Sequence, residues 1–589
     1  MVRCRRCRSA LRRSAERATQ ERPVTAMSEI TVGAYLLRRL REMDIEHVFG
    51  VPGDYNLGFL DQVVACPGLE WVGTCNELDA GYAADGYGRL RGAAAVVTTF
   101  GVGELSAVNA IAGSYAESVP VLAITGMPAT AVATAGTPVH HTLMDGEYDH
   151  FGRMFAEVTV ARATLTAQNA PAEIDRVLNA LRRHRKPVHL NLPTDVVLAR
   201  VPEPAAPLAA ADAPTDPALL GAFRDAAARM LAGARTVTVL AGHEADRHGL
   251  RAQLAELLAA APVRAAVYST GKGLVDEGVP GFAGVYTGEF SAKSARMAVE
   301  DADCLILTGA PVTDTVTGGV THHFPAGRTI ELRPGRATVR GAEFAGVTMT
   351  DALATLTALV RELRLPEPAG HGTLPAPTAA PVAGPDRGAV DGPLTQDALW
   401  AAVGAFLPPA GVLVAEQGTA FFGAQELPLP RDARFVGQPM WGSIGYTLPA
   451  TLGTQLAAPD RRSVLVIGDG SLQLTAQELG TLACYGLSPV VVVINNDGYT
   501  VERAIHGATA PYNDIAAWDY TALPAAFGAG DRCVTRRVTT PAELTDAFRL
   551  ATDTPDRLVL IEAVLPRDDA PELLTALAGR FAEQNDYGN

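Results

Sequence analysis

Two side chains that carry hard oxygen atoms stand at the ends of two apolar runs in the last third of the chain. Asp469 follows the run VLVIG, within a Gly-Asp-Gly turn, and Asn496 follows the run VVVVIN. In a βαβ unit two such runs form parallel strands that end at one edge of a sheet, so both side chains are expected at that edge. With a backbone carbonyl near Gly498 they offer three ligands of the kind that Mg²⁺ prefers. The spacing therefore predicts a divalent-cation site.

The residues around that turn also suit a diphosphate held by the cation. Gly470 lets the backbone approach a phosphate closely, and a helix that begins at Ser471 would point its N-terminus toward it. Mg²⁺ commonly takes only a few ligands from protein and the rest from phosphates and water. An ordinary turn is the alternative, because a Gly-Asp-Gly tripeptide arises easily in a chain with 57 glycines. The flanking strand and helix and the later Asn-Asn pair favour the diphosphate.

A pair of neighbouring histidines, His140 and His141 in TPVHHTLMDGEYDHF, has the residue type for proton transfer or metal binding near neutral pH. Neighbouring residues point to opposite faces of a strand and diverge on a helix, so adjacency alone does not make a chelating pair. A second pair, His322 and His323 in GVTHHFP, has the same spacing in unrelated surroundings, and we expect it to be structural or at the surface. The role of the first pair depends on the residues that the fold brings to it.

Short β-branched runs and helical patterns alternate along the chain, and these elements must position the polar residues. Runs such as AAAVVTTF, VPVLAITG, RTVTVLAG and SPVVVVINN are apolar on both faces, which is typical of buried parallel strands. Around Asp469 we predict the strand VLVI, one helix over SLQLTAQELGTLACY and the strand PVVVVI. The fold class is therefore α/β with open parallel sheets, whose ligands bind beyond the carboxyl ends of the strands.

Two stretches rich in Pro, Ala and Gly, at 202–217 and 366–393, lack apolar periodicity and are predicted to be linkers. They divide the 589-residue chain into three open α/β domains, expected at 28–201, 218–365 and 394–575. The middle segment carries no nucleotide-binding fingerprint, because STGKGL lacks the full frame of a P-loop. The first and third domains could share a fold.

Charge and composition exclude several classes of partner. The formal net charge of -15 argues against nucleic acid or an anionic membrane as the main partner. No apolar run approaches the roughly 20 residues that span a bilayer. The 7 cysteines show no repeated framework, which predicts a reducing, cytoplasmic location. Residues 1–27 are basic and lack the apolar region of a signal peptide, so we interpret them as a disordered arm or a mis-assigned start, with translation beginning at Met27.

From about Ile30 onward the chain resembles the thiamine diphosphate-dependent pyruvate decarboxylase family. The matching stretches, in order, include VFGVPGDYNLGFLDQV (48–63), NELDAGYAADGYGRLRG (76–92), the doublet at 140–141, EQGTAFFG (416–423) and NDGYTVERAIHG (496–507). More closely, TDTVTGG (313–319) and EQGTAFFG are similar to the branched-chain, phenylpyruvate and indolepyruvate decarboxylases. The resemblance implies pyrimidine-binding, middle and diphosphate-binding domains, with thiamine diphosphate and Mg²⁺ as cofactors.

The resemblance also implies which residues bind and activate the cofactor. Glu77 would share a proton with the ring nitrogen of the cofactor's aminopyrimidine, although a first-turn glutamate that serves the helix dipole has the same pattern. Ile444 would wedge between the two cofactor rings, and the carbonyl of Gly442 would meet the exocyclic amine. The other implied cofactor-binding residues are Gln417, Gly418, Thr419, Gly470 and Ser471.

Four further acid–base residues are implied by the resemblance: Asp54, His140, His141 and Glu502. They would handle protons while the 2-oxo acid loses carbon dioxide, through an enamine on the cofactor, and leaves as an aldehyde. In the family one subunit contributes the aspartate, Glu77 and the histidines, and the other contributes Glu502. A homodimer is then the minimum and a homotetramer is expected. Metal binding by the doublet becomes the least favoured interpretation, because the magnesium has oxygen ligands elsewhere.

The resemblance places five residues around the side chain of the 2-oxo acid: Thr99, Thr315, Phe421, Val501 and Ile505. Val501 and Thr315 are smaller than the residues that crowd this pocket in pyruvate-restricted relatives. We therefore expect branched-chain, aromatic or indolepyruvate substrates, with pyruvate as a further candidate. Volume differences discriminate by only about 1–3 kcal/mol per methylene, so the specificity should be broad.

The main alternative is a thiamine diphosphate-dependent carboligase, such as an acetohydroxyacid synthase-like enzyme, which shares the fold, the magnesium clamp and the activating glutamate. The histidine doublet and Glu502 favour nonoxidative decarboxylation, because a carboligase must keep its intermediate unprotonated until a second carbonyl arrives. A catalytically idle thiamine-binding protein is the other alternative. The presence of every expected acid–base residue argues against it.

Overall fold

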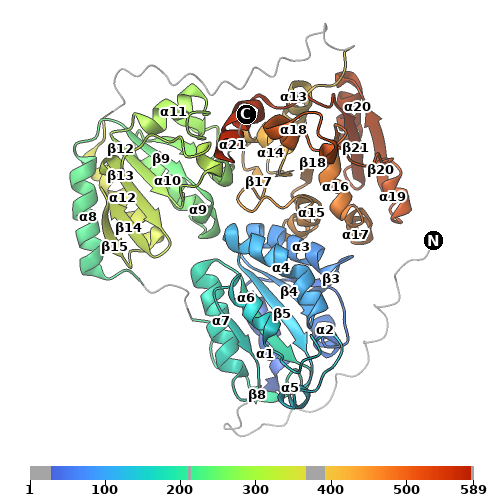
Figure 1. The fold of residues 1–589 in the computed structure, drawn as a ribbon. Coiled ribbons are helices and arrows are strands. Elements are labelled where there is room, and N and C mark those ends of the chain that lie inside the picture. The colour runs from blue at the N-terminus through green and yellow to red at the C-terminus, as the bar shows by residue number, and fades with distance from the viewer. Residues whose placement is uncertain (1–27, 210–213, 367–391, 586–589) are drawn as a thin grey trace.

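The computed structural model describes residues 28–209, 214–366 and 392–585. Three α/β domains lie around a common junction: the first is blue to teal, the middle is green to yellow, and the third is orange to red (Figure 1). The predictions for 1–27 concern residues outside the described part, as do most of those for the linker 366–393. None of the described helices is both long and apolar enough to cross a membrane.

The first domain is built on a six-stranded sheet with the order β3-β2-β4-β5-β7-β6, in which all neighbours are parallel. A separate antiparallel pair, β1 with β8, joins the two ends of the domain. The strands are β1 (Glu29–Thr31), β2 (His47–Gly50), β3 (Glu70–Gly73), β4 (Ala94–Thr99), β5 (Val121–Met127), β6 (Arg162–Thr164), β7 (Val188–Pro193) and β8 (Arg200–Pro202). The helices are α1 (Val32–Glu42), α2 (Leu57–Ala65), α3 (Glu77–Arg91), α4 (Val102–Ala116), α5 (Thr130–Thr134), α6 (His150–Ala156) and α7 (Ala170–His184).

The third domain repeats this topology in a six-stranded parallel sheet with the order β17-β16-β18-β19-β21-β20. In both sheets the second strand lies at one edge beside the first, followed by the third, fourth, sixth and fifth. The strands are β16 (Val412–Ala415), β17 (Arg434–Val436), β18 (Ser463–Gly468), β19 (Val490–Asn495), β20 (Cys533–Val538) and β21 (Leu558–Val564). The helices are α13 (Gln396–Phe406), α14 (Thr419–Glu426), α15 (Thr447–Ala457), α16 (Asp469–Thr475), α17 (Glu478–Cys484), α18 (Thr500–His506), the 3₁₀ turn η4 (Pro511–Asn513), α19 (Leu523–Ala526), α20 (Pro541–Asp553) and α21 (Glu572–Gln584).

The middle domain has a seven-stranded sheet with the order β11-β10-β9-β12-β13-β14-β15. Strand β14 runs antiparallel to both of its neighbours, β13 and β15, so this sheet is mixed, which corrects the prediction of an open parallel sheet. The cause is a tight hairpin in which Arg333 pairs with Arg336 across a Pro-Gly turn, with Gly335 at a φ of 72°. The strands are β9 (Val237–Ala241), β10 (Arg264–Val267), β11 (Phe282–Val285), β12 (Cys304–Thr308), β13 (Thr329–Arg333), β14 (Arg336–Val339) and β15 (Ala342–Ala345). The helices are α8 (Pro217–Leu231), α9 (His243–Arg247), α10 (Arg251–Ala260), α11 (Lys293–Glu300), α12 (Met349–Leu363) and the 3₁₀ turns η1 (Ser269–Gly271), η2 (Thr315–Thr317) and η3 (Ala326–Arg328).

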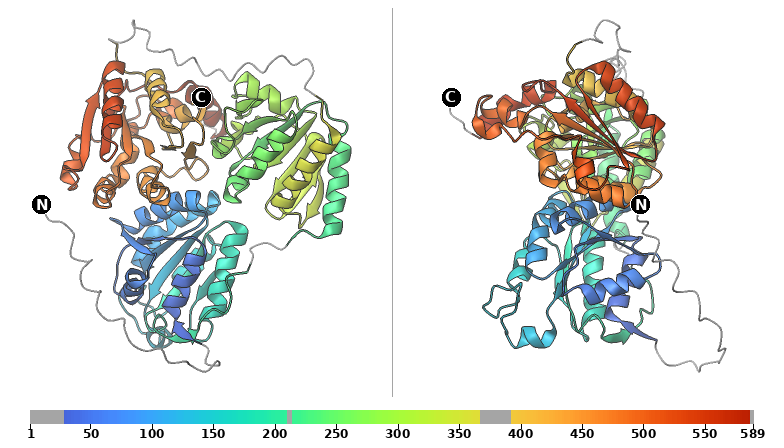
Figure 2. Two further views of the ribbon diagram at one scale, coloured as in Figure 1. Left: turned by 180° about the vertical axis from the view of Figure 1, so that it is seen from behind. Right: turned by 90° about the vertical axis from the view of Figure 1, so that its right-hand side faces the viewer.

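Alternate side chains of the first-domain strands face two different apolar layers. Val48 and Val97 pack with residues of α1, α2 and α7, whereas Phe49 and Val96 pack with residues of α3 and α4. The second layer continues into the third domain, where it includes Tyr446. The first and third domains therefore share one apolar core, and Figure 2 shows their helices in direct contact.

Small residues let α3 and α15 approach at the centre of this contact. A Cβ at Gly86 would lie 2.3 Å from the carbonyl oxygen of Ala450, and one at Gly453 would lie 1.9 Å from the carbonyl oxygen of Ala83. A larger side chain at either glycine would push the helices apart. The pairing of the first and third domains within one chain thus depends on backbone-to-backbone packing.

The single helix predicted over SLQLTAQELGTLACY is wrong. The structure has two helices there, α16 and α17, and the first begins at Asp469. Between them the amide of Leu479 donates to the carbonyl of Ala476, and that of Gly480 donates to Gln477. These bonds span three residues instead of four, so the chain tightens and the α-helix is interrupted.

The ends of the predicted domains also differ. Helix α21 continues to Gln584, beyond the boundary expected at 575, because its apolar face packs against the third domain. The first linker is not fully separate from the first domain. Leu208 packs against the core of that domain, and its backbone amide donates to Glu42.

Candidate active site

A cavity of about 510 Å³ opens in the third domain, beyond the carboxyl ends of β16, β18 and β19. Parallel strands end at one edge of a sheet, so the loops that follow them converge there. The cavity is lined by Glu416, Gln417, Gly418, Thr419, Ala420, Gly442, Ile444, Gly468, Asp469, Gly470, Ser471, Asn496, Gly498, Tyr499, Thr500, Val501, Glu502, Tyr512 and Asn513.

Asp469 directly follows β18 and is 1% exposed. Its carboxylate accepts hydrogen bonds from the backbone amides of Gly470 and Gly498, at 2.7 and 3.1 Å. Burial raises the pKa of Asp469 to about 6, although the backbone hydrogen bonds act in the opposite direction. A divalent cation in the cavity would supply the opposite charge that a buried carboxylate needs.

Asn496 follows β19, which is adjacent and parallel to β18. Its Nδ2 atom donates to Thr500 Oγ1 at 2.8 Å, which fixes the orientation of the side-chain amide. Gly498 has a φ of 120°, and a Cβ there would lie 2.2 Å from the carbonyl oxygen of Asn513, so only glycine fits. The structure thus brings the aspartate, the asparagine and this glycine together in one cavity.

Further features of the cavity suit a bound diphosphate. Gln417 Oε1 and Asn513 Oδ1 are buried and have no hydrogen-bond partner within the described part of the chain. An added Cβ at Gly418 or Gly468 would meet no atom within 4 Å, so there is open space along the backbone. A diphosphate bound with a cation requires oxygen ligands for the cation and open space along the backbone for the phosphate groups. These residues therefore fit thiamine diphosphate with a divalent cation.

Glu416 also lines the cavity, and sequence reasoning did not single it out. It is 1% exposed, and its carboxylate accepts hydrogen bonds from the amide and the hydroxyl of Thr447, at 3.2 and 2.6 Å. Burial raises the pKa of Glu416 to about 7. The signal that could have identified it is its place at the start of the matching EQGTAFFG stretch.

The histidine doublet lies on the first domain, between α5 and α6, beside Asp54. Asp54 Oδ2 is 2.7 Å from His140 Nε2, and Oδ1 is 3.9 Å from His141 Nε2. The ring of Tyr55 stacks on His140 with its centroid 5.0 Å away. A carboxylate beside two imidazoles can hold and pass protons near neutral pH. The ligand atoms of the three residues lie within 4.8 Å of one another, so they could also hold a cation.

Glu77 is the first residue of α3 and lies close to Thr99. A Cβ at Gly103 would lie 3.1 Å from Glu77 Oε1 and 3.2 Å from Thr99 Cγ2. Thr99 also approaches Gly53, the residue before Asp54. An added Cβ at Gly53 would lie 2.5 Å from the Cβ of Thr99. The first domain therefore gathers these polar side chains beyond the carboxyl ends of β2, β3 and β4.

Within one chain only some of the predicted site residues line the cofactor cavity. The third-domain residues that line the cavity are Gln417, Gly418, Thr419, Gly442, Ile444, Asp469, Gly470, Ser471, Asn496, Gly498, Val501 and Glu502. The residues that do not line it are Asp54, Glu77, Thr99, His140, His141, Thr315, Phe421 and Ile505. Glu502 stands at the cavity in α18, and its partial desolvation raises its pKa.

Phe421, predicted to line the substrate pocket, does not line the cofactor cavity. It lies against Phe435 in a narrow space that also borders the middle domain at Ser269. Neighbouring residues of a helix point about 100° apart, so Phe422 takes the other direction. Phe422 packs with Val501 and with three leucines of α21: Leu573, Leu574 and Leu577.

Two other predicted pocket residues, Ile505 and Thr315, lie on elements that approach this cluster. Ile505 is on α18, which packs against α21. Thr315 begins η2 in the middle domain, where an added Cβ at Gly318 would lie 2.6 Å from Phe290. Phe290 packs against the cluster formed by Phe422 and the leucines of α21. The middle domain thus touches the apolar side of the candidate site.

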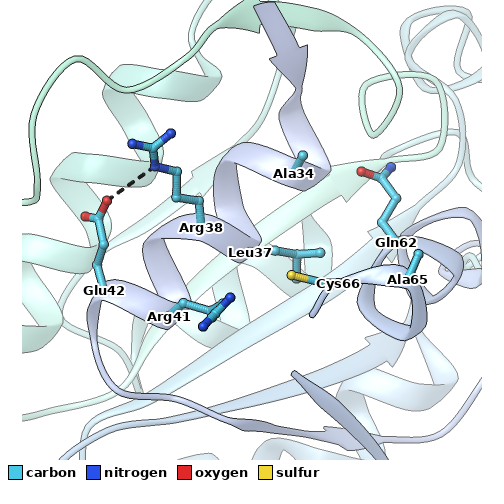
Figure 3. Close-up of a pocket in the computed structure, with 8 residues that line it drawn as sticks. All are labelled: Ala34, Leu37, Arg38, Arg41, Glu42, Gln62, Ala65 and Cys66. Atoms are coloured by element: carbon cyan, nitrogen blue, oxygen red, sulfur yellow. Dashed lines mark ion pairs between the residues drawn. The ribbon is translucent and has the colours of Figure 1, made fainter. Parts of the chain in front are cut away.

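A groove of about 680 Å³ lies elsewhere, between α1 and α2 on the outer part of the first domain (Figure 3). Its polar lining includes Arg38, whose Nε is 3.7 Å from Glu42 Oε1, together with Arg41 and Gln62. None of the site residues predicted from the sequence lines this groove. We therefore assign this groove no catalytic role, although it is larger than the cofactor cavity.

Three family models match the chain in the order of its domains. They describe a thiamine pyrophosphate enzyme N-terminal TPP binding domain over 30–150, a central domain over 224–362 and a C-terminal TPP binding domain over 418–563. The chain is therefore a thiamine pyrophosphate enzyme, which confirms the predicted α/β fold class and thiamine diphosphate as cofactor.

Curated relatives narrow the family further. The alpha-keto-acid decarboxylase of Mycolicibacterium paratuberculosis is 48% identical over 547 residues, which are 93% of this chain and 96% of that protein. The enzymes of the same name from Mycobacterium leprae and Mycobacterium tuberculosis are 47% and 48% identical over 94% of this chain, and cover 96% and 98% of their own length. The chain belongs to this family of thiamine diphosphate-dependent 2-oxo acid decarboxylases, as predicted.

Proposed function

We propose that this enzyme releases carbon dioxide nonoxidatively from branched-chain, aromatic or indolepyruvate 2-oxo acids and returns the aldehyde, with pyruvate as a poorer substrate. The observation that carries the proposal is the group of Asp54, His140 and His141 within 4.8 Å. Release of an aldehyde requires a proton at the carbon that has lost carbon dioxide, and this group can supply one. A carboligase must keep protons away from the same carbon.

A second copy of the chain would complete the site. The cofactor cavity is lined by third-domain residues alone, while Asp54 and His140 on the first domain have 49% and 59% of their side chains exposed. A homodimer in which the first domain of one copy covers the cavity of the other would bring Glu77 and the histidines to Glu502. This makes a homodimer the minimum working unit, and the family resemblance favours a homotetramer.

Mg²⁺ is the cation that we propose for the cavity, held by Asp469, the side-chain oxygen of Asn496 and the backbone carbonyl of Gly498. Thiamine diphosphate, when bound, supplies a carbon nucleophile and accepts the electron pair that carbon dioxide leaves behind. The protein's part is to hold it between Gly442 and Ile444 on one side and the partner's first domain on the other.

The proton-transfer steps are then divided between the two copies of the chain. Glu77 would hold a proton at the ring nitrogen of the aminopyrimidine. Asp54 Oδ2 can accept a hydrogen bond from His140 Nε2 at 2.7 Å, and Oδ1 lies 3.9 Å from His141 Nε2, so His140 or His141 can carry the proton to the carbon that has lost carbon dioxide. Glu502 faces them from the third domain, and its raised pKa lets it exchange a proton nearer to neutral pH than an exposed glutamate can.

The substrate preference is supported by the apolar cluster beside Val501. Phe422, Leu573, Leu574 and Leu577 are buried and form an apolar wall behind Val501, which lines the cavity. Burial of apolar area contributes roughly 25 cal/mol per Å², and a branched or aromatic side chain buries more apolar area than a methyl group does. We propose Phe422 in place of Phe421 on this side of the pocket.

A panel of 2-oxo acids tests the proposed function. Carbon dioxide and aldehyde would be measured for 2-oxoisovalerate, phenylpyruvate, indolepyruvate and pyruvate with added thiamine diphosphate and Mg²⁺. We expect equal amounts of the two products and the lowest kcat/KM for pyruvate. A pyruvate efficiency well above the others would refute the preference, and an acyloin as the main product would favour the carboligase.

Variants of the two histidine pairs test the role of the doublet. We expect His141→Ala to lower kcat by about a hundredfold or more while it still binds the cofactor, and Glu77→Gln to lose at least as much. The matched control is His323→Ala, because His323 has the same neighbour but is exposed on the middle domain. Near-normal turnover of the His141 variant would remove the doublet from the mechanism.

A further inference from the structure

Two buried carboxyl groups meet where α3 of the first domain contacts α17 of the third. Asp79 lies in the first turn of α3, Glu478 begins α17, and both residues are 0% exposed. Asp79 Oδ1 and Glu478 Oε2 are both buried, and neither has a hydrogen-bond partner in the described part of the chain. The two carboxyl groups interact, because Glu478 contributes to the raised pKa of Asp79. Because an ionised carboxylate can only accept, the two unpartnered oxygens can satisfy each other only if one of the carboxyl groups carries a proton.

The other oxygens of this pair hold the turn that leads into Glu77. Asp79 Oδ2 accepts a hydrogen bond from Gln477 Nε2 at 2.7 Å. Glu478 Oε1 accepts a hydrogen bond from the backbone amide of Cys75 at 2.8 Å. Both hydrogen bonds join the first domain to the third. The chain just before Glu77 is therefore tied to α17 through both carboxyl groups.

Asn76 connects the pair to the start of α3. It is the N-cap of that helix, and its Oδ1 accepts from the backbone amide of Asp79 at 2.9 Å. Its Nδ2 atom donates to Asp79 Oδ2 at 2.8 Å. The same carboxyl group thus contacts the third domain and the cap of the helix turn that carries Glu77.

The surroundings of the pair favour a single shared proton. The titratable groups that face it are the thiol of Cys75 and the hydroxyls of Tyr82 and Tyr485, and burial raises the pKa of all three, so they are neutral at neutral pH. Burial and the adjacent Glu478 raise the pKa of Asp79 to about 9. Two carboxylates in contact without water cannot both ionise without a large penalty, so the pair titrates as a unit.

We propose that Asp79 and Glu478 share one proton and act together as a positioning pair, which holds the 73–76 turn against the third domain and thereby places Glu77. This inference rests on the proposed role of Glu77 toward the cofactor. Loss of the shared proton at high pH puts two negative charges in contact across the domain boundary. The turn then loosens and Glu77 moves, while the apolar core of the two domains stays packed.

A comparison of Asp79→Asn with Asp79→Ala in the holoenzyme tests the pair. Asparagine is a neutral replacement for the protonated acid and can still donate to Glu478, whereas alanine removes every contact. We expect wild-type kcat to fall at least about tenfold from about pH 7 to about pH 10, since small displacements of an activating group are costly. Asp79→Asn should keep kcat within about threefold of wild type at neutral pH and lack that alkaline fall, while Asp79→Ala should lose at least about tenfold in kcat with little change in KM.

Amide hydrogen exchange of the 73–80 segment gives a readout that needs no turnover. After correction for the intrinsic rate, exchange should rise with pH in the wild type, be high at neutral pH in Asp79→Ala and stay low in Asp79→Asn. The control is Glu104→Gln, because burial raises the pKa of Glu104 to about 8 and this carboxyl titrates in the same range. It should leave both the exchange of the segment and the alkaline fall unchanged.

The two readouts separate this inference from the proposed function. If exchange behaves as expected but no 2-oxo acid is decarboxylated, the pair positions the turn and the proposed function is wrong. If the enzyme is active and Asp79→Asn shows the same alkaline fall and the same exchange as the wild type, the inference is overturned. Unchanged kcat in Asp79→Ala would overturn it as well.

Discussion

One aspartate contributes charge to each half of the proposed site. Asp469 is 1% exposed in the cofactor cavity, and Asp54 is half exposed beside the histidines. Burial makes the charged form of the first costly unless a cation joins it, whereas the second lies at the surface beside two imidazoles. Two aspartates in one protein are thereby suited to different tasks, one to metal binding and one to proton transfer.

Replacement of Asp469 by alanine should weaken the binding of thiamine diphosphate in the presence of Mg²⁺ by at least about a hundredfold, because it removes the charged oxygen ligand. Cofactor binding would be measured by calorimetry over a range of Mg²⁺ concentrations, and chelation by EDTA should produce the same loss in the wild type. The matched control is Asp497→Asn, because Asp497 is nearby but has 64% of its side chain exposed. Equal affinity in Asp469→Ala and the wild type would contradict the assigned cation site.

His189 should make the first domain sensitive to acid. It is 1% exposed, its Nε2 lies 2.9 Å from Thr125 Oγ1, and burial lowers its pKa to about 3. The unfolded chain takes up a proton below about pH 6.5 and the folded chain does not, so the free energy of unfolding falls as pH drops through this range, by up to about 1.4 kcal/mol per pH unit.

The variant His189→Gln should lose this part of the pH dependence. Between about pH 6.5 and about pH 5 the wild type should therefore lose about 1.6 kcal/mol more stability than the variant, as measured by urea unfolding. His184→Gln serves as the control, since His184 is exposed on the same domain. Identical pH curves for wild type and His189→Gln would rule out the buried neutral histidine as the cause.

At the scale of elements, the strands and the turns after them could be predicted from the sequence. Runs of Val and Ile on both faces identify β18 and β19, and their parallel pairing brings Asp469 and Asn496 to one edge. The interruption between α16 and α17 could not be predicted, because its residues favour a continuous helix. Gln477 at the break donates to Asp79 of another domain, and such tertiary contacts have no local signal.

The choice between two adjacent aromatic residues shows the same limit. Phe421 and Phe422 are equivalent in any apolar pattern, and both lie on α14. Only the packing of α21 shows that Phe422 faces Val501. A pattern identifies that a helix has an apolar side, whereas the partner on each side is fixed by elements far away in the chain.

The crossing of α3 and α15 should be intolerant of side chains. We expect Gly453→Val to destabilise the protein by at least about 3 kcal/mol, because the added carbons would overlap the carbonyl of Ala83 and force two packed helices apart. Thermal unfolding of the purified variant would measure this. Gly221→Ala is the control, because Gly221 lies in α8 with no atom within 4 Å of an added Cβ, and it should be neutral or slightly stabilising. Equal melting temperatures for the Gly453 variant and the wild type would contradict the close crossing.

At the scale of the whole molecule, two domains of one topology carry complementary halves of a site. Both place functional groups beyond the carboxyl ends of their strands, as open α/β sheets do. The first presents acid–base groups on an exposed surface, and the third presents a cavity with oxygen ligands. The first and third domains of one chain are joined through α3 and α15, and in the proposed homodimer the functional edge of each domain meets the complementary edge of another copy.

Subunit complementation should therefore restore activity that each parent variant lacks. Glu77→Gln and Glu502→Gln change opposite halves of the site, and each should be inactive as a homodimer. When the two are produced together with different affinity tags and the mixed dimer is isolated, one site contains both changes and the other contains neither. The mixed dimer should show about half of the wild-type turnover, as two-fold symmetry requires.

The control for complementation is a mixed dimer of Glu77→Gln with His141→Ala. Both changes lie in the first domain, so each of its two sites keeps one defect and it should stay inactive. If the Glu77→Gln and Glu502→Gln mixture were equally inactive, each site would have to be built within a single chain. Restored turnover in the first mixture and none in the second can arise only if the first domain of one copy works on the third domain of the other.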